Sequence, residues 1–138
     1  MALKPFNPAR RITPLYADLD LALRVHPNKK DIVPLTDIDA VKQSVKNIVL
    51  TNYGEKLFKP KFGGNVTGLL FENVNVFTLI SLRKEIESLL QRFEHRIDEI
   101  NIDVIDNTNA NAFDVTIEFR IIDTNTNAEM NLTLNRTR

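Results

Sequence analysis

Apolar residues recur at helical spacing in two segments of the chain, which predict its two main helices. In residues 36–51 they recur every three or four positions, and Thr36 followed by Asp39 resembles a capping box. In residues 77–93 the large apolar side chains share one face and the charged side chains share the other. We therefore expect a helix over each range, with the second contributing the largest part of the core.

Alternating apolar and polar positions predict strands on both sides of these helices. The alternation is present in residues 15–25, and it returns in residues 100–104, 113–121 and 130–134. Turns rich in Asn and Asp separate the last three segments, so these should form a consecutive antiparallel meander. The predicted fold class is α+β, with two helices packed on a small, mainly antiparallel sheet that includes a C-terminal three-strand meander.

We expect one domain preceded by an arm. The chain has 138 residues, 43% of them apolar, which is enough for a single hydrophobic core. Residues 1–14 are rich in proline, which predicts an extended N-terminal arm that either docks on a partner or frays. Residues 15–138 are predicted to be a single domain. The N-terminus lacks the apolar core of a signal peptide, and no transmembrane span is expected.

The charge balance favours protein partners. Basic and acidic side chains number 18 each, so no overall positive field would attract a nucleic acid. The absence of cysteine excludes disulfides, thiolate metal sites and a cysteine nucleophile. We expect no nucleic-acid or membrane partner.

Residues 53–75 form the irregular part of the chain. All four glycines lie there, which indicates backbone conformations or close approaches that a side chain would prevent. A segment of this length in a small domain carries function or contains short elements, and residues 67–71 could form one helical turn.

Catalytic chemistry finds little support in the sequence. A glycoside hydrolase needs two carboxylates beside a cleft, one of them with a raised pKa, and the candidates are Glu55, Glu72 and Glu94. Arg96 lies two residues from Glu94 and should lower the pKa of that carboxylate. The two histidines form no metal-binding motif. We expect no catalytic residue, no metal and no cofactor.

Three short motifs, in order, resemble a known family. They are FKPKFG at residues 58–63, LFE at 70–72, and EHR at 94–96 before the predicted meander. The chain resembles the gene-25-like baseplate wedge proteins of contractile-tailed phages (the GPW and gene-25 family), which are sometimes labelled lysozyme-like. The resemblance runs from about Leu15 to the C-terminus.

The resemblance implies a structural subunit that links the wedge core to the tail sheath and initiates sheath polymerisation. It implies multiple copies in the virion tail baseplate, assembled in the host cytoplasm, with wedge core-bundle proteins and the tail sheath protein as partners. His95 replaces the proline of the family's Glu-Pro-Arg motif. The implied wedge-core contacts are Glu94, Arg96, Pro60, Phe62 and Gly63, and the implied sheath-pairing residues are Met130, Leu132 and Leu134.

Two other functions remain open at this stage. A small lysozyme-like glycan hydrolase would use the carboxylates weighed above. An adaptor in a related contractile injection system would use the same surfaces with other partners.

Overall fold

A computed structural model describes residues 14–136 and divides the chain into two compact units, Met1–Ala40 and Val41–Arg138. The division falls after Ala40, whereas the sequence suggested a boundary after residue 14. Residues 1–13 of the predicted arm lie outside the described residues, so the arm stays a prediction.

The first unit contains a short antiparallel pair of strands, β1 (Ala17–Leu19) and β2 (Pro34–Thr36). The strand predicted over residues 15–25 is interrupted because the chain turns after β1. The carbonyl of Asp20 accepts the N–H of Leu23 at 2.9 Å, and the Asp20 carboxylate accepts the N–H of Ala22 at 2.9 Å. These local bonds compete with strand pairing.

Residues 14–136 contain three α-helices, of which the two long ones were predicted to within a residue at each end. They are α1 (Asp37–Leu50), α2 (Val66–Leu70) and α3 (Val76–Phe93). The predicted single turn corresponds to α2. Asn75 caps α3, since its side chain accepts the N–H of Thr78 at 2.8 Å. Thr36 is the last residue of β2 and lies directly before α1, so the capping-box interpretation of Thr36 and Asp39 stays a prediction.

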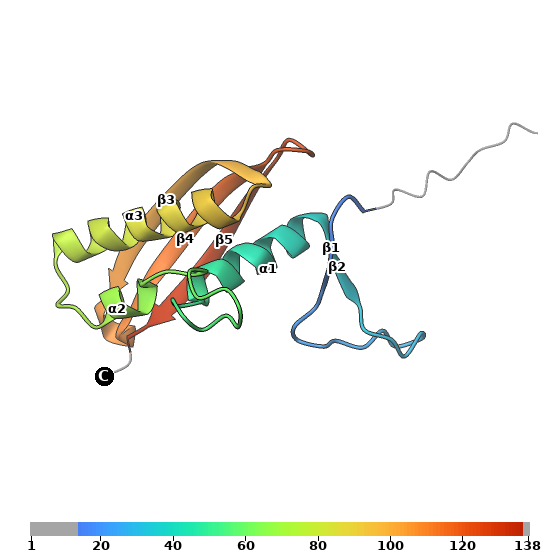
Figure 1. Ribbon diagram of the computed structural model, residues 1–138, viewed down its shortest axis with the longest axis horizontal. Coiled ribbons are helices and arrows are strands. Elements are labelled where there is room, and N and C mark those ends of the chain that lie inside the picture. Colours follow the sequence, from blue (N-terminus) through green and yellow to red (C-terminus); the bar gives the residue numbers. More distant parts are fainter. Residues whose placement is uncertain (1–13, 137–138) are drawn as a thin grey trace, which may run out of the picture. The chain divides into compact units, whose positions relative to one another are not determined.

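The second unit is built on the predicted meander, with β3 (Ile97–Asn107), β4 (Ala112–Ile121) and β5 (Thr126–Asn135) in the order β3-β4-β5. Both pairs are antiparallel, and Figure 1 shows α3 running along one face of this sheet. A short 3₁₀ turn, Thr108–Ala110, connects β3 to β4. The α+β class with a C-terminal meander is therefore confirmed.

The start of β3 contains a bulge that the alternation did not reveal. Glu99 and Ile100 oppose the single residue Phe119 of β4, and Glu99 has a φ of 48°. Arg120 bridges the irregularity through ion pairs with Asp98 and Glu99, each 2.9 Å long. The bulge bends β3 locally, close to the point where the chain leaves α3 and enters the sheet.

The core of the second unit is formed by the buried faces of α1 and α3 and by the inner face of the sheet, with Val41, Val45, Ile48 and Val49 contributed by α1. The side chains that α3 contributes are Leu82, Ile86, Leu89 and Leu90, each at most 1% exposed. The most buried partners from β4 are Phe113, Val115, Ile117 and Ile121. The apolar face of α3 packs against the inward side chains of β4. This is why the sequence shows a helical repeat in α3 and a two-residue alternation in β4.

Candidate interaction site at the end of helix α3

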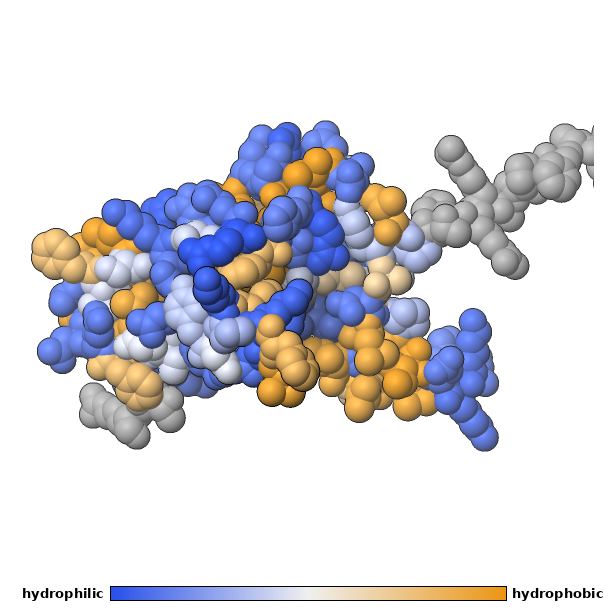
Figure 2. Space-filling view, in the orientation of Figure 1, coloured by the Kyte–Doolittle hydropathy of each residue, from blue (hydrophilic) through white to orange (hydrophobic). Residues whose placement is uncertain are grey.

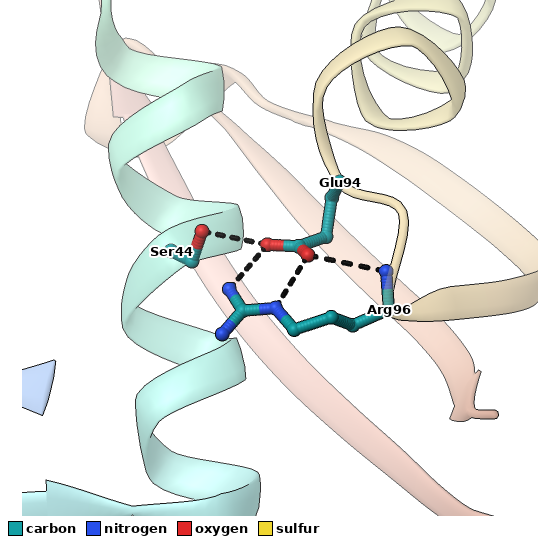
Figure 3. Close-up of polar contacts among 3 residues, drawn as sticks. All are labelled: Ser44, Glu94 and Arg96. Atoms are coloured by element: carbon teal, nitrogen blue, oxygen red, sulfur yellow. Dashed lines mark hydrogen bonds and ion pairs between the residues drawn. The ribbon is translucent and has the colours of Figure 1, made fainter. Parts of the chain in front are cut away.

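The turn that follows α3 is organised by one buried carboxylate. Glu94 is 4% exposed and ends α3, where its N–H donates to the carbonyl of Leu90 at 2.9 Å. Arg96 donates to it through Nε and Nη2, each at 2.7 Å, in a two-bond fork. Ser44 Oγ from α1 donates to Glu94 Oε2 at 2.6 Å (Figure 3).

The electrostatics of this cluster favour an ionised carboxylate. Burial of Glu94 raises the pKa of its carboxyl, whereas hydrogen bonds from Arg96 and Ser44 and the charge of Arg96 lower that pKa by more. The pKa of Glu94 therefore lies below its ordinary value. The side chain of Arg96 is 30% exposed. Glu94 thus fixes the turn from inside, and Arg96 is the member of the pair that reaches the surface.

The glycine pair in the irregular segment sits where a side chain would collide. Gly63 has a φ of 96°, and a Cβ there would lie 2.3 Å from the carbonyl oxygen of Thr51. A Cβ on Gly64 would lie 2.5 Å from Leu89 of α3. The N–H of Gly64 also donates to the carbonyl oxygen of Thr51 at 3.1 Å. The pair therefore fastens the loop against the end of α1 and against α3.

A groove with aromatic walls and a cationic rim lies between this loop and the last turn of α3. Its volume is 580 Å³, and no carboxylate is among its lining residues. The rings of Phe62 and Phe93 pair at 4.7 Å between centroids. The residues that line this groove, called here the basic-aromatic groove, are Lys56, Phe58, Lys59, Pro60, Lys61, Phe62, Arg92, Phe93 and His95.

The structure therefore brings together the residues for which a wedge-core role was implied. Pro60 and Phe62 line the basic-aromatic groove, Gly63 lies buried beneath it in the loop, and Glu94 and Arg96 form the adjacent turn. Their role in binding stays a prediction. Glu94 itself is directed inward, so its part in any contact is to hold the turn.

β5 lies at one edge of the sheet in the described part of the chain. Directly after the β4–β5 register, the N–H of Arg136 donates to the carbonyl of Asn111 at 2.9 Å, and the side-chain amide of Asn111 donates to the carbonyl of Arg136 at 2.8 Å, so the backbone groups of Arg136 are directed toward the β4 side. Hydrogen-bonded and non-hydrogen-bonded pairs alternate along antiparallel strands. The β5 residues whose backbone groups point away from β4 are therefore Asn127, Glu129, Asn131, Thr133 and Asn135.

Met130, Leu132 and Leu134, for which sheath pairing was implied, direct their side chains toward the core and do not present them at the free edge. Leu132 and Leu134 are 8% and 3% exposed, and Met130 is partly buried. The same alternation directs their backbone groups toward β4. Strand addition at this edge would use the backbone of their neighbours, while these three side chains hold β5 on the core.

The carboxylates weighed for hydrolysis do not form an acid–base pair. Hydrogen bonds from the side chain and N–H of Asn52 lower the pKa of Glu55, and the pKa of Glu94 is lowered too, whereas a general acid needs a raised pKa. Glu94 lines a hollow together with Asp98 and Glu99, and neither Glu55 nor Glu72 is among its lining residues. Among the described residues, no three or more His, Cys, Asp or Glu side chains are arranged so that they could hold a metal ion together.

Sequence reasoning missed Ser44 and the cations of the groove. Ser44 carries no local signal, because its partner Glu94 is 50 residues away. Lys56, Lys59 and Lys61 could have been found from their alternation with apolar and aromatic residues across 56–62. None of the described helices is long and apolar enough to cross a membrane.

The fold and the site define a small α+β domain with a turn held by hydrogen bonds, a groove and a sheet edge. The model of the family "Baseplate wedge protein gp25" matches residues 36–126, and the chain belongs to this family. Baseplate wedge protein gp25 of Enterobacteria phage T4 is 32% identical over 112 residues, which cover 81% of this chain and 84% of that protein.

Solved structures share the fold. A candidate tail lysozyme from Geobacter sulfurreducens superimposes with a TM-score of 0.66 and 24% identity, covering 71% of this chain and 89% of that one. A chain of the anti-feeding prophage baseplate superimposes with a TM-score of 0.56 and 18% identity, covering 89% of this chain and 87% of that one. At these identities the likeness concerns the fold.

Proposed function

We propose that this protein is a structural subunit of the baseplate wedge in a contractile tail, and that it links the wedge core to the tail sheath. The observation that carries the proposal is the family match, which includes α3, the Glu94–Arg96 turn and β3 and β4. The proposed location is the virion tail baseplate, in multiple copies, after assembly in the host cytoplasm.

The proposed contact with the wedge core-bundle proteins is the surface around the end of α3. Arg96 is partly exposed and is held by the fork to Glu94, so its orientation is fixed before a partner arrives. A preorganised side chain loses less conformational entropy on binding than a free one. The basic-aromatic groove next to it adds apolar surface to the same contact.

The proposed contact with the sheath is the outer edge of β5. Thr126–Asn135 contains no proline and no lysine, the residues that commonly protect a sheet edge from further pairing. Strand addition would satisfy the outward N–H and carbonyl groups of alternate residues along this strand. We propose that the first sheath subunits pair here and that sheath polymerisation starts from this pairing.

We also propose that the protein is not an enzyme. The lowered pKa values of Glu55 and Glu94 are opposite to the requirement for a glycosidase acid. Turnover of purified peptidoglycan by the isolated protein, lost in a Glu72→Gln or Glu94→Gln variant, would contradict this part of the proposal.

The wedge-core contact is tested by replacing Arg96 in the system that encodes the protein. Arg96→Ala removes the fork and the exposed cation, and we expect purified baseplates to lack the variant. Arg96→Lys keeps the charge without the fork and should incorporate in part. Circular dichroism and gel filtration check that both variants fold as the parent does. Normal incorporation of folded Arg96→Ala protein would refute the proposed contact.

A further inference from the structure

The basic-aromatic groove concentrates charge that the chain as a whole does not have. The net charge of the protein is zero, yet Lys56, Lys59, Lys61 and Arg92 line one groove without a carboxylate among them. Lys56 Nζ lies 4.0 Å from the centroid of Phe62, and Arg92 Cζ lies 5.5 Å from that of Phe93. Such cation–π contacts hold the cations along the aromatic walls.

The loop also exposes an aromatic ring at a conformational cost. Phe58 is 99% exposed and has a φ of 64°, in the left-handed region that bulky side chains avoid. Two backbone hydrogen bonds hold the loop. The N–H of Lys59 donates to Lys56 O at 3.2 Å in a turn that contains Phe58, and the N–H of Phe62 donates to Lys59 O at 3.0 Å directly after it. A strained residue that contributes nothing to the core points to a role outside the fold.

We propose that the basic-aromatic groove binds an acidic segment of a partner protein that carries a large apolar side chain. This inference rests on the proposed function, because it names the chemistry of the partner at the end of α3. The apolar side chain would pack against Phe58, Phe62 and Phe93. Its flanking carboxylates would pair with the lysines and Arg92.

The charge of the groove argues against residues 1–13 of a second copy of this chain as its occupant. Residues 1–13 carry Lys4, Arg10 and Arg11 and no acidic residue, so the arm of a second copy would be repelled by the rim. The aromatic geometry argues against single-stranded nucleic acid. Phe62 and Phe93 are partly buried and tilted by 48° against each other, which does not provide the successive flat platforms on which bases stack.

Figure 2 shows hydrophobic surface next to strongly hydrophilic surface where the segment between α1 and α2 lies in Figure 1. An acidic segment with one apolar anchor matches this adjacency. A purely acidic segment would leave the apolar walls uncovered, and a purely apolar segment would leave the cations without partners.

The test measures binding of a synthetic peptide to the full chain by fluorescence anisotropy. The labelled 12-residue probe has a central Phe-Leu pair with five glutamates on each side; comparison probes replace the glutamates by glutamine or the Phe-Leu pair by alanine. We expect the first probe to bind at least tenfold more tightly than either comparison, and its affinity to fall as salt is raised.

Matched variants locate the binding. A triple variant with Lys56→Gln, Lys59→Gln and Lys61→Gln should lose at least tenfold in affinity, and so should Phe58→Ala. The control triple, Lys46→Gln, Arg83→Gln and Lys84→Gln, removes the same charge from exposed positions outside the groove and should bind within twofold of the parent. Absence of binding by the parent, or an equal loss in both triples, would overturn the proposal.

Two further outcomes separate this inference from the proposed function. Suppose that a 12-nucleotide oligothymidine binds more tightly than the Phe-Leu probe and that the Lys56→Gln, Lys59→Gln, Lys61→Gln variant (the groove triple) loses this binding. That result would overturn the inference in favour of nucleic acid. Normal baseplate incorporation of the groove triple, together with failure of Arg96→Ala, would overturn the inference and leave the proposed wedge-core contact standing. If neither the groove triple nor Arg96→Ala is incorporated into baseplates, the result supports both this inference and the proposed wedge-core contact.

Discussion

Glu94 fixes the turn after α3 from inside the candidate interaction site. It receives hydrogen bonds from Ser44 and Arg96 at 2.6 to 2.7 Å and is 4% exposed. A buried carboxylate with these partners fixes the positions of both neighbouring elements. The two-bond fork from Arg96 holds the turn that contains His95.

Replacing Glu94 by Gln should lower the free energy of unfolding at pH 7 by about 1 to 3 kcal/mol, because a charge-assisted fork becomes a neutral contact. The folded-state pKa of Glu94 lies below its ordinary value of about 4.3. Its stabilising contribution is therefore present above that pH and is lost as the pH falls through the folded-state pKa.

Urea unfolding at pH 7 and at pH 3 measures this prediction. The difference between the parent and Glu94→Gln should shrink at the lower pH. Glu72→Gln, at an exposed position, serves as the control and should match the parent at both pH values. A constant difference across the range would contradict the assigned pKa direction.

At the scale of elements, α3 is the main support of the second unit. Ile86 and Leu89 are at most 1% exposed, so Ile86→Ala or Leu89→Ala should each lower the free energy of unfolding by about 2 to 5 kcal/mol. Ile80→Ala, at a position 45% exposed on the same helix, should change it by less than about 1 kcal/mol. Thermal and urea melts check the contrast, and near-neutral changes at both core positions would refute it.

β5 carries the second element-scale prediction. Glu129→Pro removes one N–H that points away from β4, so the β4–β5 ladder should survive with a loss of stability of about 1 kcal/mol or less. The proposed strand addition loses a donor, so the fraction of tails with an assembled sheath should fall in electron micrographs. Glu129→Ala keeps the N–H and should assemble normally. Normal sheaths with Glu129→Pro would count against pairing at this edge.

The elements that sequence reasoning found are those specified by local periodicity. The α3 stripe and the unbroken alternation of β4 each repeat over many residues, so they could be predicted nearly to their ends. β2 has three residues and no repeat, and the bulge at Glu99 depends on the register with β4. Such features follow from pairing between strands, which one segment of sequence does not contain.

The candidate site was predictable only in part for the same reason. The glycine pair and the Glu-His-Arg triplet stand out in the sequence. Their relation to Ser44 and to Arg92 depends on the packing of the loop, α1 and α3, and no local pattern reports it. The assignment of Leu132 and Leu134 to a partner contact stays a prediction. Their side chains are buried, and strand addition at this edge would use the backbone groups that alternate with them.

At the scale of the whole molecule, the described surfaces divide the proposed contacts between two parts of the second unit. The end of α3 and the basic-aromatic groove are assigned to the wedge core, and the edge of β5 is assigned to the sheath. A subunit with two separate contacts can connect two partners without catalysis. Sheath, tube and spike genes beside its own gene would identify the contractile machine that it serves.

The central claim is tested most directly by cross-linking mass spectrometry on purified tail particles. A lysine-reactive cross-linker should join Lys56, Lys59 or Lys61 to another baseplate protein, because these lysines line the proposed contact. Lys46 and Lys84, outside the groove, provide the internal comparison. The account predicts that the protein is present in the particles with cross-links concentrated at 56–61. Absence from the particles, or cross-links to baseplate proteins confined to Lys46 and Lys84, would contradict it.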